Sequence, residues 1–94
     1  MEEQQPIRVR TPRQGEVLGI VDEVLGASRF RVSCQDSKDR ICRVSGKFRR
    51  RIWVKTGDVV LVKPWDIQPE DRGDIVWRYT RTQAGWLQKR GFLK

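Results

Sequence analysis

The stretch from Lys38 to Lys55, KDRICRVSGKFRRRIWVK, concentrates the residue types most able to bind a charged ligand. It holds eight basic side chains against one acidic one, so it carries +7 of a formal net charge of +8. Its basic residues are Lys38, Arg40, Arg43, Lys47, Arg49, Arg50, Arg51 and Lys55. Trp53 follows the densest run. Cations displace counterions from phosphates and an aromatic ring stacks on an exposed base, so the block predicts a nucleic-acid-binding surface. A solvated basic loop is the alternative.

The chain lacks the residues of the common catalytic and metal-binding sites. It has no histidine, and its two cysteines, Cys34 and Cys42, do not have the CxxC spacing of zinc ligands. No nucleophile elbow and no glycine-rich phosphate loop occurs. We therefore expect no enzyme, no catalytic residue, no metal and no cofactor. Both cysteines are interpreted as buried thiols in a reducing compartment.

The composition indicates one small domain with a polyanionic partner. The 94 residues are too few for two cores, and a pI near 10.3 favours nucleic acid as the ligand. No apolar run approaches 18 residues, and MEEQQPIRVR lacks the hydrophobic segment of a signal peptide. We expect a monomer that acts in the cytoplasm, away from membranes.

The chain divides into three parts, which must position the basic block. Residues 1–14 mix Glu, Gln, Pro and Arg and predict a flexible basic arm. Residues 15–80 hold the apolar segments of the core, and residues 81–94 predict a helix and tail. Within the middle part, strands are expected over 15–26, 28–34, 40–44, 59–62 and 74–80, with a bend or bulge at Gly19 of the first and Pro64 ending the fourth.

The second and third strands show a period of two. Phe30, Val32 and Cys34 are expected to face inward, and Arg29 and Arg31 to project outward. If the turn spans residues 36–38, Phe30 pairs with Val44, Val32 with Cys42 and Arg31 with Arg43. Two arginines facing each other are destabilising, which favours a negative partner over them. A two-residue turn would change this register.

Two helices are expected. In residues 45–52, SGKFRRRI, the i, i+4 pair Phe48 and Ile52 predicts a short helix that caps the barrel and leaves its basic residues exposed. In the tail, Thr80 and Gln83 have the spacing of a capping box, and Gly91 suits a helix end. Trp53 has apolar neighbours on both sides, so both an exposed stacking role and a place in the core remain open.

Three strands, a short helix and two strands is the element order of a mainly β fold, the five-stranded OB-fold barrel. An SH3-like barrel is the main alternative. The OB-fold binds nucleic acid across its second and third strands and the loops beside them, which is where Arg29, Arg31 and Arg43 are expected.

The segments LGASRFRVSC, DRICRVSGKFRRRIWV and GDVVLVKPWD together resemble the translation initiation factor 1A family of archaea and eukaryotes, and more distantly the bacterial initiation factor one. The resemblance covers about residues 15–80 and extends to the expected C-terminal helix. It implies a factor that binds the small ribosomal subunit near the aminoacyl-tRNA decoding site through ribosomal RNA and assists start-codon selection. By analogy it also implies contact with initiation GTPases and other initiation factors.

The resemblance assigns RNA contacts to basic residues and to one tryptophan, Trp53. With the arginines expected on the barrel face, the candidate RNA-binding residues are Arg29, Arg31, Arg40, Arg43, Lys47, Arg49, Arg50, Arg51 and Trp53. Ser45 stands where eukaryotic members often have arginine, and the chain lacks their acidic C-terminal extension, so the archaeal type is expected. A cold-shock-like chaperone for single-stranded RNA and an SH3-like module for acidic proteins are the alternative functions.

Overall fold

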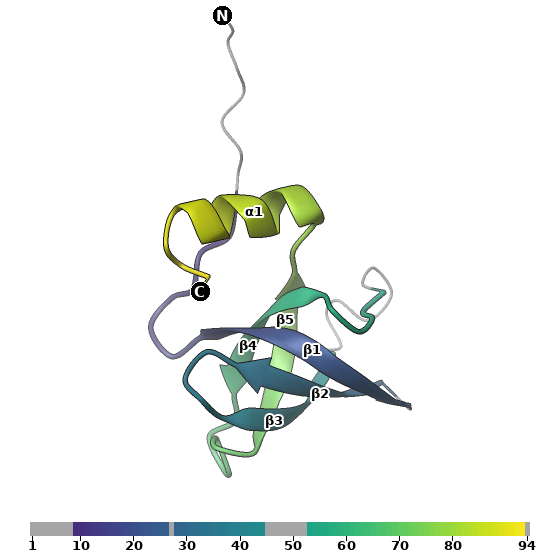
Figure 1. Ribbon diagram of the computed structural model, residues 1–94. Coiled ribbons are helices and arrows are strands. Elements are labelled where there is room, and N and C mark those ends of the chain that lie inside the picture. The colour runs from purple at the N-terminus through teal and green to yellow at the C-terminus, as the bar shows by residue number, and fades with distance from the viewer. Residues whose placement is uncertain (1–8, 27, 45–52, 94) are drawn as a thin grey trace, which may run out of the picture.

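The computed structural model in Figure 1 describes residues 9–26, 28–44 and 53–93. Its elements are β1 (Val17–Gly26), β2 (Arg29–Cys34), β3 (Asp39–Val44), β4 (Val59–Pro64), β5 (Arg72–Arg78) and α1 (Arg81–Lys89). The strands close into a barrel in the order β1-β2-β3-β5-β4, with β1 paired to β4. The β3–β5 pair is parallel and the other pairs are antiparallel.

This topology confirms the predicted five-stranded OB-fold barrel over the SH3-like alternative. The short helix expected over residues 45–52 lies outside the described residues. The helix α1 packs against the outer side of β1 and β4 and is drawn above them in Figure 1. In the described part of the chain, no helix has the length and apolar character needed to cross a membrane.

Two apolar clusters hold the fold together. The barrel interior is filled by Val21, Phe30, Val32, Cys34, Cys42, Val44, Val60, Val62 and Ile75. A second cluster, formed by Leu18, Leu61, Tyr79, Leu87 and Leu93, lies between the barrel and α1. The strand β4 contributes to both clusters, which explains its continuous apolar run: it is buried on both faces.

The expected bulge at Gly19 is wrong. The register shifts of β1 fall later, between Val21 and Glu23 and between Val24 and Gly26. Gly19 instead marks a close approach of two strands: a Cβ there would lie 2.5 Å from Val32 Cγ1 and 3.0 Å from the carbonyl oxygen of Ser33. Glycine is therefore required here by the close approach of Val32 and Ser33.

The β2–β3 register differs from the one expected for a turn over residues 36–38. The turn begins one residue earlier: Cys34 N donates to Lys38 O (2.9 Å), Ser37 N donates to Cys34 O (3.1 Å), and Ser37 has a φ of 69°. A three-residue loop with its last residue in the left-handed region is a common hairpin connection. The shift of two positions keeps every side chain on its predicted face, but Arg29, and not Arg31, now faces Arg43.

The helix α1 has both expected ends. Thr80 Oγ1 accepts from Gln83 N, and the Gln83 side chain accepts from Thr80 N, which completes the capping box. At the other end Gly91 has a φ of 83°, and the amides of Gly91 and Phe92 donate to the carbonyls of Gln88 and Leu87. This is the Schellman arrangement. Leu87 is fully buried against the barrel, so the tail docks within the molecule.

Residues 9–14, which the sequence assigns to the arm, lie against the body of the protein. Val9 packs on the cluster under α1, the Arg10 guanidinium pairs with Glu16 at 3.0 Å, and Tyr79 Oη donates to Arg10 O. The chain is therefore anchored from Val9 onward, ahead of the first strand.

Candidate nucleic-acid interface

Trp53 points away from the barrel. Its side chain is 87% exposed, whereas the next residue, Val54, packs against the barrel interior. The turn that follows Val54 holds the backbone in place, because Lys55 N donates to Asp58 Oδ2 (2.9 Å) and Asp58 N donates to Lys55 O. Of the two roles left open by the sequence, the structure therefore excludes the core, and a large aromatic face remains available for stacking.

The outer face of β2 and β3 carries arginines, as the period of two predicts. Arg29, Arg31 and Arg43 are exposed on this face, whereas Phe30 between them is 7% exposed and belongs to the core. Arg31 is neutralised by Glu23 at 2.7 Å. Arg29 makes no ion pair or side-chain hydrogen bond with the residues that the structure describes, so its charge is uncompensated.

Arg43 is part of a fixed stack. Its guanidinium lies 4.9 Å from the ring centroid of Trp65, and its Nε donates to Asp74 Oδ1 at 3.1 Å. Trp65 Nε1 donates to the same oxygen at 3.0 Å. One carboxylate oxygen thus orients both side chains, and we call this pair the Trp65–Arg43 wall. The guanidinium keeps donors that no described residue accepts from.

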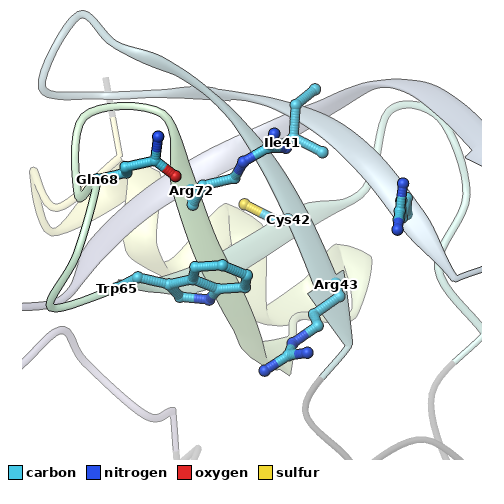
Figure 2. A pocket seen from close by; sticks show the side chains of 7 residues that line it. Ile41, Cys42, Arg43, Trp65, Gln68 and Arg72 are labelled. Atoms are coloured by element: carbon cyan, nitrogen blue, oxygen red, sulfur yellow. The ribbon is translucent and has the colours of Figure 1, made fainter.

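A surface hollow of about 340 Å³ opens beside the wall, and we call it the Trp65 groove. Figure 2 shows the side chains that line it: Arg29, Ile41, Cys42, Arg43, Trp65, Gln68 and Arg72. A second hollow of about 290 Å³, bounded by Lys63, Pro64 and Asp66, also reaches both wall residues. The groove therefore lies where β3 and β5 run in parallel, beside the loop between β4 and β5.

Arg40 does not project onto this surface. The residue is only 3% exposed, and its guanidinium donates two bonds to the Asp36 carboxylate (2.9 and 2.8 Å) and one to Pro69 O (2.6 Å). The same bonds lower the pKa of the Asp36 carboxyl and raise that of Arg40. Because Arg40 shares the inward face of β3 with Cys42, we remove it from the candidate RNA contacts. Its role is to tie the β2–β3 hairpin to the β4–β5 loop.

The remaining candidates lie outside the described residues. They are Lys47, Arg49, Arg50 and Arg51. The described residues nearest to them in sequence are Val44, which is buried in the barrel interior, and the exposed Trp53.

Sequence reasoning did not assign Trp65, Gln68 or Arg72 to the interface. The sequence alone does not distinguish packing under the 66–74 loop from partner contact for Trp65, and only the fold brings this residue beside Arg43. The available signal was Asp74, an acid in the middle of a strand, where a carboxylate needs a partner.

Comparisons with known proteins agree over nearly the whole chain. A family model described as translation initiation factor 1A / IF-1 matches residues 6–94. A translation initiation factor 1A of Methanothermobacter thermautotrophicus is 53% identical over 87 residues, 93% of this chain and 88% of the relative. One from Methanococcus aeolicus is 53% identical over 96 aligned residues, 100% of this chain and 91% of the relative.

A solved structure is also similar. The solution structure of translation initiation factor one from the Wolbachia endosymbiont strain TRS of Brugia malayi is 40% identical, with a TM-score of 0.55. The similarity covers 71% of this chain and 79% of that chain.

Proposed function

Because the chain belongs to the translation initiation factor 1A / IF-1 family and is of the archaeal type, its role lies in translation initiation, and we propose that it performs this role by binding ribosomal RNA of the small subunit near the aminoacyl-tRNA decoding site. Bound there, it assists assembly of the initiation complex and start-codon selection. The observation that carries the proposal is the 87% exposed ring of Trp53 in a barrel whose outer β2–β3 face carries the uncompensated charge of Arg29.

The chemistry of binding divides between charge and stacking. Arg29 and Arg43 of the barrel face contact phosphates, together with Lys47, Arg49, Arg50 and Arg51 of the basic block. Trp53 stacks on a base or sugar that is displaced from its helix, an interaction worth about 1–3 kcal/mol. Arg31 contributes less, since Glu23 already holds its guanidinium.

The partners are small-subunit RNA and, through the exposed surface of the α1 region, initiation GTPases and other initiation factors. The protein acts as a monomer. A general single-stranded RNA chaperone is disfavoured by Phe30, because such proteins place aromatic rings on the outer face of the second and third strands. Here that ring fills the core.

Co-sedimentation with purified small subunits tests the proposal. The full chain should bind in the presence of a large excess of unstructured RNA, and Trp53→Ala should weaken binding about 5- to 150-fold with an unchanged melting temperature. Ile67→Ala is the matched control, because Ile67 is 77% exposed but lies away from Trp53 in the chain. Displacement by the unstructured RNA would instead support the chaperone.

Salt dependence supplies a second measurement. If about six phosphates are neutralised, log K should fall against log[salt] with a slope of about −4 to −5. A nearly flat slope would contradict an electrostatic interface.

A further inference from the structure

A single acid lies within a row of cations on the outer face of the barrel. The registers of three strand pairs align the row across four strands: Arg29 on β2, Arg43 on β3, Asp74 on β5 and Lys63 on β4. Residues directly opposite each other in neighbouring strands present their side chains on the same face. A carboxylate among three cations repels a phosphate, so its place in this row indicates a second role for Asp74.

Asp74 holds Arg43 by the inner nitrogen of the guanidinium. Arg43 Nε donates to Asp74 Oδ1 at 3.1 Å, which leaves both terminal nitrogens without an acceptor among the described residues. The Arg31–Glu23 pair is the opposite case, because Arg31 donates through its terminal Nη1 at 2.7 Å. Glu23 therefore occupies the end of an arginine that would reach a ligand, whereas Asp74 leaves that end of Arg43 free for a phosphate.

The same carboxylate oxygen also holds the surface on which Arg43 lies. Trp65 Nε1 donates to Asp74 Oδ1 at 3.0 Å, and the Arg43 guanidinium lies 4.9 Å from the centroid of the Trp65 ring, as Figure 2 lets the reader follow. Both side chains of the Trp65–Arg43 wall are thus oriented before any ligand arrives. Side chains that are already ordered lose less freedom on binding, which lowers the entropic cost of a contact.

We propose that Asp74 is a positioning residue that makes the RNA-binding face selective for folded RNA over unstructured RNA. A phosphate of a folded RNA has a fixed place, so its affinity depends on a guanidinium that is already directed toward it. A flexible strand can move its phosphates to any cation, gains little from this orientation and is repelled by the carboxylate. The inference rests on the proposed RNA-binding function and assigns selectivity to a residue that acts through Arg43.

The two effects of Asp74 have opposite signs, and their sizes differ. Immobilising one side chain at an interface lowers affinity about 2- to 12-fold, and Asp74 orders two side chains, Arg43 and Trp65. Removing one exposed charge changes affinity about two- to fivefold in the other direction. Asp74→Ala should therefore bind purified small subunits about 3- to 30-fold more weakly and poly(U) about two- to fivefold more tightly.

Equilibrium binding of the full chain to small subunits and to poly(U), at one salt concentration, measures both changes. Asp74→Asn keeps an oxygen that accepts from both partners, so this variant should retain most of the affinity for small subunits. Glu23→Ala is the matched control on the same face: it frees the terminal nitrogen of Arg31 and should raise both affinities. Melting temperatures of all variants show whether a change in affinity accompanies a loss of folding.

Nitrogen-15 relaxation of the free protein checks the step that precedes binding. The Nε–H group of Arg43 should be as rigid as the backbone in the parent protein and in Asp74→Asn, and mobile in Asp74→Ala. A mobile Arg43 in the parent would overturn the inference, as would an Asp74→Ala protein whose two affinities change in the same direction. Displacement of the parent protein from small subunits by poly(U) would instead contradict the proposed function itself.

Discussion

Replacing Arg40 with methionine tests the claim that this arginine is structural. Methionine keeps a flexible, unbranched side chain of useful length in the buried site but removes all three bonds that the guanidinium donates. Hydrogen bonds that involve a charged group contribute about 1.5–3 kcal/mol each, and desolvation of the guanidinium offsets several kcal/mol of that sum. The partner Asp36 keeps 38% of its side chain exposed and can be hydrated again after the change. We therefore expect a loss of about 2–3 kcal/mol in the free energy of unfolding.

Thermal and urea unfolding of the full chain measure this loss. In a domain of this size, 2–3 kcal/mol corresponds to a fall in melting temperature of about 8–24 °C. Arg40→Lys should recover less than half of it, since an ammonium cannot reach two carboxylate oxygens and a carbonyl in one plane. Asp36→Asn, which changes only the exposed partner, should cost less than Arg40→Met, and the double variant should add little to Arg40→Met.

The pH dependence gives an independent check. Arg40 holds the pKa of Asp36 below its ordinary value, so the pair stabilises the native state above about pH 4, and this contribution disappears as the pH falls through the lowered pKa. The acid-dependent part of the stability should be smaller in Arg40→Met than in the parent protein. An Arg40→Met protein that melts with the parent would refute the reasoning, because the bonds would then only balance the cost of burying the charge.

Three further predictions concern the packing. Gly19→Ala should destabilise the protein by about 1–3 kcal/mol, because its Cβ would overlap Val32. Gly85→Ala in α1, where a Cβ meets nothing within 4 Å, should stabilise the protein by about 1 kcal/mol. Urea unfolding of both variants measures the two changes. Burial raises the pKa of Tyr79 to about 12, so stability should fall as the pH rises from about 10 toward 12, and Tyr79→Phe should reduce this fall, to which the buried thiol of Cys42 also contributes; a parent protein with a flat profile over that range would contradict it. Burial also raises the pKa of Cys42 to about 12, so a thiol reagent at pH 8 should label it only after unfolding, and rapid labelling of the native protein would count against the packing.

Alternation along the strands predicted most of the fold. The period of two in SRFRVSC placed Phe30 in the core and the arginines outside, and the capping box identified the start of α1 to the residue. The register depended on where one turn begins, which local propensity does not determine. Because the error was two positions, an even number, every residue kept its face.

At Arg40 the residue type alone suggests the wrong location. It lies two residues before inward-facing Cys42, so the same alternation already predicted an inward side chain. Its charge suggested a surface role instead, because arginine is rarely buried without a partner. The partner, Asp36, stands four residues earlier in the hairpin loop, and Pro69 comes from a loop that only the folded barrel brings near. Trp65 was missed for the same reason, since its neighbours Arg43 and Asp74 are distant in sequence.

The pairing of β1 with β4 and of β3 with β5 leaves each of the five strands with a neighbour on both sides. Within the described residues, such a sheet leaves little open edge to which another polypeptide could add a strand, since of β1 only the part beyond Val21 lacks a partner on the β4 side. Recognition of this barrel should therefore rely on side chains more than on strand addition, and the same closure disfavours the edge-to-edge association of strands that leads to fibres.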